Sequence, residues 1–219
     1  MVRVLAVASH PDDESFLFGG TLAVHARRGH AVALLCLTDG QAGRTSGVCS
    51  QAELPAVRRA ELRRACELLG IGVPIMPGLP DGGLAQFGEE RGVEVVARTV
   101  REFLPDVLLT FGPDGASGHE DHKAAWRWSG VAAAGRTLYA ATFPESVGPE
   151  EPLPLTTVVD ISKLGDLKRR AFLEHKSQLD HLELFDRVQA AYQGTEQYHR
   201  VHPAWQKGAP CERGLLLDR

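Results

Sequence analysis

The stretch VRVLAVA, residues 2–8, runs directly into SHPDDE, residues 9–14. A short, nearly continuous run of Val, Leu and Ala is typical of a strand covered on both faces, as in a parallel sheet. Similar runs predict strands over residues 31–37 and 107–111, and weaker ones over 73–76, 138–143 and 157–161. Because two adjacent carboxylates follow the first strand at once, both the fold and a candidate site begin at this junction.

Segments with helical spacing separate these runs. They predict helices over residues 14–28, 55–69, 90–103, 121–134 and 163–184, of which the last is the longest. Gly70 follows the second of them as a C-terminal stop signal. Strands that alternate with helices indicate an α/β fold with a mainly parallel sheet and helices on both faces. The Pro-rich segment 144–154 is expected to be an exposed loop, and the segment after Gly194 to wrap the domain or pack on another subunit.

Length and charge limit the function. The 219 residues fit a single domain, 1–219, with ample chain for a hydrophobic core. With 24 basic and 28 acidic residues, the net charge of −4 favours a small molecule or a protein as partner over nucleic acid. No apolar run reaches the roughly 18–20 residues of a membrane span, and the N-terminal run is too short for a signal peptide. We therefore expect a cytoplasmic protein without a membrane partner, its four scattered cysteines being free thiols.

Ionisable residues gather where the predicted strands end. SHPDDE follows the first strand, Thr38-Asp39-Gly40 the second, and GPDGASGHEDH, residues 112–122, follows the run 107–111. Ligands of an open parallel sheet bind outside the carboxyl ends of its strands. The sequence therefore predicts one site at this edge of the sheet.

The first of these segments concentrates negative charge at a helix start. Pro11 biases His10 toward an extended backbone. Asp12 and Asp13 then fall in the turn that opens the next helix, where free N–H groups and the helix dipole favour carboxylates. A plain structural interpretation is that one carboxylate caps this helix. That accounts for one carboxylate, but not for two beside a histidine.

The other segment places His119 and His122 three residues apart, near each other if a helix starts there. A pair of exposed surface histidines is the alternative. Taken together, the two segments supply His10, Asp13 and His122, which suit a catalytic zinc with one open coordination position. Magnesium fits less well, because it prefers oxygen ligands throughout.

SHPDDE resembles the (A/S)HPDDE segment of the LmbE-like, or PIG-L, deacetylases, and GHEDH, residues 118–122, resembles their GHxDH segment. Further similarities follow in the family's order over about residues 2–180: Thr38-Asp39-Gly40, Arg58-Arg59-Ala60-Glu61, Leu68-Leu69-Gly70, Asp81-Gly82 and His175-Lys176-Ser177-Gln178. Residues 181–219 would form a C-terminal extension. The resemblance implies a Rossmann-like fold and a hydrolase, with one zinc per chain, that removes acetyl from an N-acetylglucosamine-type sugar.

The resemblance also implies roles for single residues. Asp12 would be the general base and His119 would support the tetrahedral intermediate. Arg58 matches a position linked to the substrate or its oxyanion, and Asp81 one linked to sugar hydroxyls. The implied metal ligands are His10, Asp13 and His122.

Several of these assignments have plainer alternatives. Asp81 could be an ordinary turn residue before glycine, and the helix that carries Arg58 could present its arginines to solvent or clamp an anion. His175 could line the site or lie on a helix surface, and Glu14 could support the ligands or the helix start. Ser117 stands where some mycothiol-pathway members have tyrosine, which speaks against that subgroup. Glu120 replaces a proline of many members, which changes the stiffness of the loop.

Two functions follow from these patterns. The first is the zinc deacetylase, acting on a small-molecule sugar conjugate, with a homo-oligomer allowed. N-acetylglucosaminyl malate, from low-molecular-weight thiol (bacillithiol) biosynthesis, is the first choice of substrate; other sugar conjugates and chitooligosaccharides stay open. The second is a non-catalytic Rossmann-like module that binds a sugar or nucleotide. No glycine-rich phosphate loop follows any predicted strand, which speaks against the second.

Overall fold

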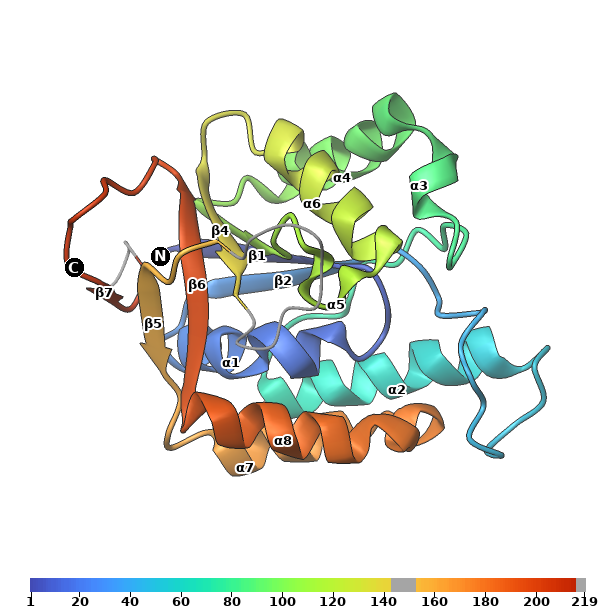
Figure 1. The fold of residues 1–219 in the computed structure, drawn as a ribbon. Helices are drawn as coiled ribbons and strands as arrows, with labels where there is room; N and C mark the ends of the chain where they lie inside the picture. The colour runs from blue at the N-terminus through green and yellow to red at the C-terminus, as the bar shows by residue number, and fades with distance from the viewer. Residues whose placement is uncertain (143–152, 216–219) are drawn as a thin grey trace.

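The computed structural model describes residues 1–142 and 153–215 of the chain. Within these residues, seven strands form one sheet in the order β2-β1-β3-β4-β6-β5-β7 (Figure 1). From β2 to β4 all neighbours run parallel, whereas β6 runs antiparallel to β4 and β5. The strands are β1 (Arg3–Ala8), β2 (Ala31–Cys36), β3 (Val107–Thr110), β4 (Thr137–Ala141), β5 (Thr157–Asp160), β6 (Thr195–His202) and β7 (Glu212–Arg213).

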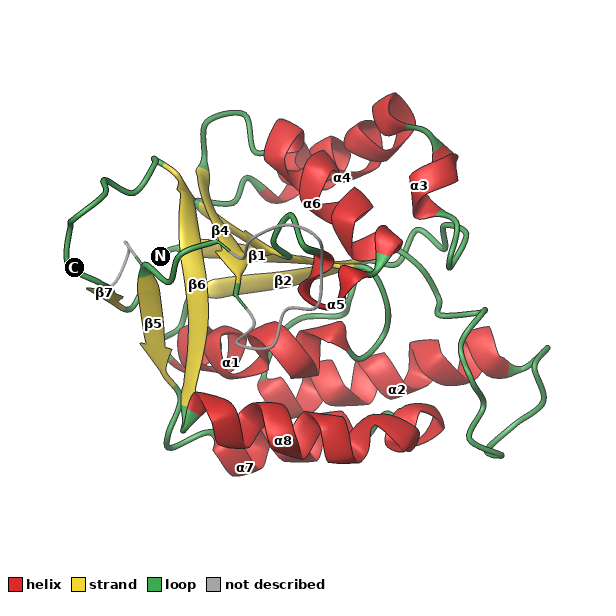
Figure 2. Cartoon of the chain, in the orientation of Figure 1, coloured by secondary structure: helices red, strands yellow, loops and turns green. Residues whose placement is uncertain are grey.

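Helices cover the sheet on both faces (Figures 1 and 2). One layer holds α1 (Gly19–Arg27), α2 (Leu54–Leu69), α7 (Gly165–Leu173) and α8 (Leu182–Tyr192). The other holds α3 (Leu84–Phe87), α4 (Glu89–Phe103) and α6 (Glu120–Ala132), with the short α5 (Gly115–Gly118) just before α6. The predicted α/β architecture with a mainly parallel sheet is therefore confirmed. No helix of the described residues is long and apolar enough to cross a membrane.

The strands with the most continuous apolar runs form the centre of the sheet. Residues 4–8 of β1 and the apolar residues of β3 are fully buried, because helices pack on both faces of these strands. Leu5 pairs with Ala33 of β2 and Leu108 of β3 in parallel register, so the three strands end at the same edge. The three polar segments of the sequence analysis follow these ends, as predicted.

Most predicted elements occur with small shifts at their ends, and α2 stops at Gly70 in a left-handed conformation (φ 74°) as expected. The predicted strand over residues 73–76 is wrong: that segment makes only an isolated bridge between Ile75 and Leu35. The predicted helix over residues 14–28 is divided into a π-helical turn, η1 (Glu14–Phe18), and α1. The strand predicted over residues 138–143 occurs as β4, which ends at Ala141. Residue 143 and most of the Pro-rich segment 144–154 lie outside the described residues.

The C-terminal third differs most from the prediction. The helix predicted over 163–184 is broken after α7, where His175 leaves helical geometry (φ −80°, ψ 63°) and a short 3₁₀ segment, η2 (Lys176–His181), precedes α8. The break coincides with burial, because His175 is fully buried instead of lying on a helix surface. Beyond Gly194 the chain does not wrap the domain: β6 enters the sheet between β4 and β5. No apolar run predicts this strand, because charged and polar residues interrupt its pattern.

Candidate active site

The segment after β1 places His10 and Asp13 side by side. His10 and Asp13 are 9% and 7% exposed. One oxygen of Asp13 accepts the backbone N–H groups of Ser9 and His10 at 3.1 and 2.7 Å, which fixes the carboxylate beneath the turn. Nδ1 of His10 lies 3.5 Å from that oxygen. The alternative in which Asp13 caps the next helix does not apply, since its side chain makes no cap bond to η1.

His122 completes the predicted set from the first turn of α6. Its Nε2 lies 3.2 Å from Nδ1 of His10 and 3.3 Å from Oδ1 of Asp13. Its Nδ1 faces the carbonyl oxygen of Gly115 at 2.9 Å, and the ring stacks on Phe111 with 4.0 Å between the centroids. The structure therefore brings together the three residues that the sequence predicts as ligands, across more than 100 residues of chain.

The hydrogen bonds around these rings determine which nitrogens carry lone pairs. A carbonyl oxygen only accepts, so Nδ1 of His122 carries the proton and Nε2 is left with a lone pair. Nε2 of His10 faces the carboxylates of Asp81 and Asp121 at 3.1 and 3.2 Å, so the lone pair of neutral His10 is on Nδ1. Two imidazole lone pairs and the Asp13 carboxylate thus converge on one point. A cation between these three groups would be bound by all of them.

Spacing and charge agree with this interpretation. Ligands bonded to zinc at about 2.0–2.1 Å in a tetrahedron lie roughly 3.3–3.4 Å apart. Here the two ring nitrogens are 3.2 Å apart, and Asp13 approaches them with different oxygens, Oδ1 at 3.3 Å from His122 and Oδ2 at 3.5 Å from His10. Burial disfavours charge on His10, but hydrogen bonds to Asp121, Asp13 and Asp81 outweigh it and raise the pKa of this imidazole well above its ordinary value. Although burial opposes it, His122 and His10 hold the pKa of Asp13 well below its usual range. The donor set therefore fits a divalent metal ion.

Asp121 was missed as a functional residue in the sequence, although it stands between the two histidines of HEDH. Its carboxylate contacts Nε2 of His10 and also accepts the N–H groups of Gly82 and Leu84, at 2.7 and 3.0 Å. Asp81 lies at the same nitrogen, and its other oxygen accepts the N–H of Ala42 at 2.7 Å. Both carboxylates thus orient His10 from behind. The available signal was a carboxylate next to a predicted ligand histidine in the sequence, since such carboxylates commonly support metal ligands.

Asp12 has a backbone conformation unlike that of its neighbours. Its φ is 136°, a region that residues with a Cβ rarely adopt, and strain of this kind concentrates at functional sites. Its carboxylate is buried and lies 3.4 Å from Nη2 of Arg58. Burial raises the pKa of Asp12, while the Arg58 charge acts in the opposite direction. A carboxylate of raised pKa beside the predicted metal ligands has the properties of a proton acceptor.

Arg58 lies at the site, but in a different setting from a solvated helix face. It is only 3% exposed, whereas Arg63 and Arg64 on the same helix are exposed. Besides facing Asp12, its guanidinium donates to the carbonyl oxygens of Pro11 and Gly40, at 2.6 and 3.1 Å. A Cβ on Gly40 would overlap the guanidinium, and this explains the glycine there. In this structure, therefore, the guanidinium of Arg58 stabilises the turn that carries Asp12.

His119 caps the N-terminus of α6. Its Nδ1 accepts the N–H of Asp121 at 3.2 Å, so in the neutral ring the proton is on Nε2. Its ring centroid lies 4.8 Å from those of both His10 and His122. Partial burial, followed by the charges of His10 and His122, lowers the pKa of His119. Unlike the predicted ligands it is exposed, which suits a group that meets a substrate.

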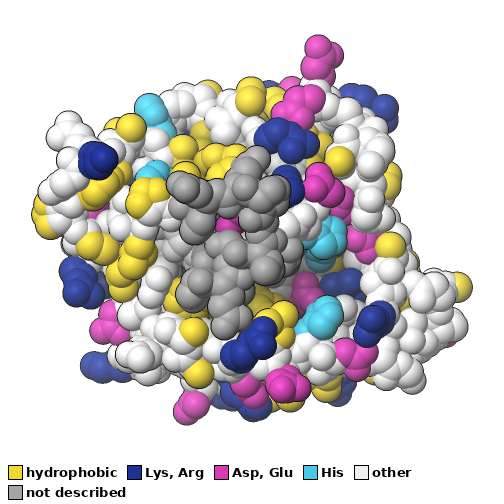
Figure 3. Space-filling model, in the orientation of Figure 1, with side chains coloured by type: hydrophobic (Ala, Val, Ile, Leu, Met, Phe, Trp, Pro, Cys, Tyr) yellow, Lys and Arg dark blue, Asp and Glu magenta, His cyan; other side chains and the backbone are white. Residues whose placement is uncertain are grey.

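Alternative groupings also include His10. In the described residues, His10 with His119 and His122, and His10 with Asp81 and Asp121, could each hold a metal ion. The second group uses the nitrogen of His10 that faces away from His122. On the face of the molecule in Figure 3, histidine and acidic side chains lie close together.

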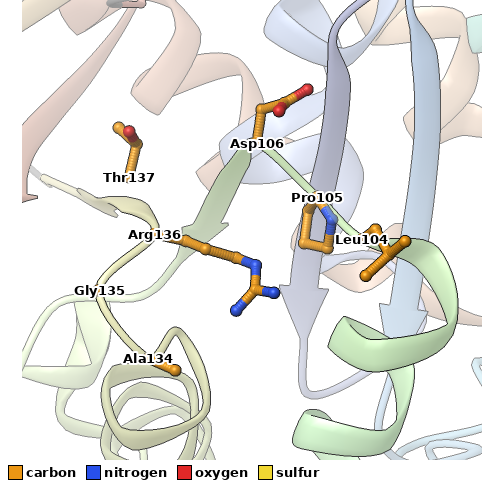
Figure 4. Close-up of a pocket in the computed structure, with 7 residues that line it drawn as sticks. All are labelled: Leu104, Pro105, Asp106, Ala134, Gly135, Arg136 and Thr137. Carbon is orange, nitrogen blue, oxygen red and sulfur yellow. The ribbon is translucent and has the colours of Figure 1, made fainter.

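A surface hollow of about 560 Å³ lies elsewhere. It is formed by residues 104–106, before β3, and by residues 134–137, which lead into the start of β4, and this places it at the opposite edge of the sheet (Figure 4). Arg136 extends between these two segments. Since the residues proposed for chemistry follow the strands, this hollow is not part of the candidate site.

The known proteins that this chain resembles in sequence include several de-N-acetylases. The model of the PIG-L family, described as GlcNAc-PI de-N-acetylase, matches residues 5–133. A relative from Bacillus subtilis, named "Probable N-acetyl-alpha-D-glucosaminyl L-malate deacetylase 2", is 30% identical, over 81% of this chain and 84% of its own. A 1D-myo-inositol 2-acetamido-2-deoxy-alpha-D-glucopyranoside deacetylase from Nakamurella multipartita is 28% identical, over 99% and 97%.

A solved structure shares the fold. The conserved protein TT1542 from Thermus thermophilus superposes with a TM-score of 0.75 at 27% identity, over 94% of this chain and 97% of that chain. The family match covers both polar segments of the site, SHPDDE and HEDH. The chain therefore belongs to the PIG-L, or LmbE-like, family of de-N-acetylases.

Proposed function

We propose that this protein is a zinc-dependent hydrolase that removes the acetyl group from an N-acetylglucosamine conjugate, with N-acetylglucosaminyl malate as the first candidate. The observation that carries the proposal is the convergence of two imidazole lone pairs and one carboxylate on a single point. His10, Asp13 and His122 would hold one zinc, and three protein ligands leave a position open, as in catalytic sites.

When bound, zinc polarises the amide carbonyl and lowers the pKa of water from about 15.7 to about 7. Asp12 accepts the proton of the attacking water, for which burial and its raised pKa prepare it. Arg58, 3.4 Å away, holds the carboxylate in place without occupying both of its oxygens. The two adjacent carboxylates thus have different roles, since that of Asp12 faces Arg58 whereas that of Asp13 faces His10 and His122.

His119 stabilises the negative charge that develops on the carbonyl oxygen, by donating a hydrogen bond from Nε2. Its other nitrogen is engaged by the N–H of Asp121, so the ring donates at one end and accepts at the other. One donor of this kind contributes roughly 3–4 kcal/mol to transition-state stabilisation. The leaving amine then receives its proton from Asp12, because the neutral His119 ring has no second proton to give.

The names of two relatives support an N-acetylated amino sugar as part of the substrate. Both names contain an N-acetylated 2-amino sugar, and they differ in the attached group, malate in one and inositol in the other. Asp81 is proposed to accept hydrogen bonds from sugar hydroxyls with lone pairs that His10 and Ala42 leave available. Because Arg58 is buried against the turn, the malate carboxylates would require a different cation.

A panel of N-acetylglucosamine conjugates, with free amine measured as product, tests this proposal. The malate conjugate, the inositol conjugate, the methyl glycoside and chitooligosaccharides are compared on protein loaded with one zinc per chain. We expect release of amine from at least the malate conjugate, and loss of zinc together with activity in Asp13→Ala and His122→Ala. Glu120→Gln, an exposed change next to Asp121, is the matched control. A wild-type protein that binds zinc but deacetylates no conjugate would favour a non-catalytic binding module.

A further inference from the structure

The segment 175–178 lies beyond the residues that the family model matches; its His175, Ser177 and Gln178 are buried, whereas Lys176 is exposed. His175 is fully buried, and its Nε2 lies 2.7 Å from Oε1 of Glu14, which is also fully buried. Nδ1 of His175 has no hydrogen-bond partner among the residues that the structure describes. The contact with Glu14 is therefore what orients this ring.

Glu14 in turn holds the backbone of the proposed base. Its Oε2 accepts the N–H of Asp12 at 3.0 Å, while Oε1 also accepts the hydroxyl of Ser15 at 2.6 Å. On the other side of the same peptide unit, Nη2 of Arg58 donates to the carbonyl oxygen of Pro11 at 2.6 Å. Both polar groups of the Pro11–Asp12 peptide are thus held, one by an anion and the other by a cation.

This peptide is the one whose orientation sets φ of Asp12. A φ of 136° is strained for a residue with a Cβ, and such a conformation persists only where the surroundings impose it. The two charged side chains come from different elements, η1 and α2, and Glu14 contacts the backbone N–H of Asp12. The clamp formed by Glu14 and Arg58 therefore acts on the direction of the Asp12 side chain through the backbone.

We propose that Glu14, held by His175, is a positioning residue: it keeps the Pro11–Asp12 peptide in the strained orientation that directs the Asp12 carboxylate toward the reacting water. This inference rests on the proposed function for the role of Asp12. It also gives the C-terminal half of the chain a part in catalysis, since His175 follows Glu14 by 161 residues. Without the clamp, the peptide rotates and φ relaxes to a negative value.

Neighbouring contacts of the same segment supply a control. Ser177 donates its N–H and hydroxyl to the two oxygens of Glu61 on α2, at 3.0 and 2.6 Å. These bonds tie the segment to α2, and neither of them involves Glu14. Ser177→Ala therefore loosens the segment while leaving the clamp on Asp12 in place.

The test compares Glu14→Ala, Glu14→Gln, His175→Ala and Ser177→Ala, each with zinc content, kcat and KM measured on the malate conjugate. In Glu14→Ala we expect kcat to fall about 10- to 100-fold, as for a misplaced catalytic group, with zinc retained and KM changed by less than about 3-fold. Gln retains an acceptor for the Asp12 N–H, so Glu14→Gln recovers most of kcat. His175→Ala shows a smaller loss, and Ser177→Ala lowers the melting temperature without this loss of kcat.

A double-mutant cycle separates positioning from an independent effect. If Glu14 acts through Asp12, Glu14→Ala causes no further loss in an Asp12→Asn background. An equal loss in both backgrounds would overturn the proposal. A crystal structure of the zinc-bound Glu14→Ala variant, or of His175→Ala if the first does not fold, gives a readout independent of turnover. A φ of Asp12 that stays positive would overturn the clamp even if no conjugate is a substrate, whereas a relaxed φ would support it.

Discussion

Nε2 of His10 lies 3.2 Å from the carboxylate of Asp121, on the opposite side of the ring from His122. The same carboxylate accepts the N–H groups of Gly82 and Leu84, and these two hydrogen bonds fix its position relative to the ring of His10. This contact determines which nitrogen of a neutral His10 presents its lone pair toward His122 and Asp13. One side chain therefore links His10, the start of α6 and the loop before α3.

Replacing Asp121 by Asn is expected to weaken zinc binding about 10- to 100-fold, because the residue that orients a ligand histidine contributes to metal affinity on this scale. Competition with a chelator of known affinity measures the change. The matched control is Glu120→Gln, whose side chain is exposed and pairs with Lys123. Equal zinc affinity in Asp121→Asn and the control would show that the contact does not orient His10.

Asp12→Asn should retain one zinc per chain and lose kcat by about 10²–10⁴-fold, since an amide cannot accept the proton of the attacking water. Asn has nearly the size of Asp, and its amide oxygen can still face Nη2 of Arg58. Metal content is measured beside kcat on the same preparation. Turnover near that of the wild type, with zinc present, would remove Asp12 from the base role.

His119→Ala should also retain zinc, with a loss in kcat larger than the change in KM. Its proposed hydrogen bond forms mainly in the transition state, so ground-state binding changes little. The loss should be about 10²–10³-fold if the ring is a single oxyanion donor. Loss of zinc would instead identify His119 as a ligand, in the alternative group with His10 and His122.

Two glycines in the layer of α4 and α6 should respond in opposite directions to alanine. A Cβ on Gly92 would overlap the ring of Trp128, which is 1% exposed, so Gly92→Ala should cost about 1–3 kcal/mol of unfolding free energy through overpacking. Gly130 is exposed on α6 with open space around the position of a Cβ, so Gly130→Ala should stabilise by about 0.5–1 kcal/mol. Denaturant unfolding measures both, and a destabilised Gly130→Ala would contradict the packing described.

A buried ion pair ties β6 to the helical layer. Nζ of Lys168 lies 2.6 Å from Glu196, the side chains being 1% and 3% exposed, and Glu196 also accepts the N–H groups of Gly20 and Thr21. Glu196→Ala leaves the ammonium buried without its partner, which should cost about 3–5 kcal/mol. Glu102→Ala, in an exposed pair with Arg98, is the control and should show no comparable loss. Similar unfolding midpoints for the two variants would mean that the buried pair adds little.

Local patterns in the sequence were sufficient for the elements near the site. The apolar run before His10 predicts β1, and the spacing that ends at Gly70 predicts α2, because burial on both faces and helical period leave direct marks on the order of residues. The same patterns failed at His175, where a buried contact with Glu14 interrupts a helical period, and at β6, whose charged residues obscure the strand. In both places contacts between distant segments outweigh local preference.

By itself, the sequence determined the α/β class and the polar segments at the ends of β1 and β3, with His10, Asp13 and His122 among their residues, since such signals lie within a few consecutive residues. Only the tertiary structure decided which nitrogen of each histidine faces the others, because this depends on Asp121 and Gly115 as hydrogen-bond partners. It also decided that Arg58 is buried against Pro11 and that Glu14 meets His175. These contacts join residues up to 161 positions apart, and their geometry follows from packing, which no local pattern records.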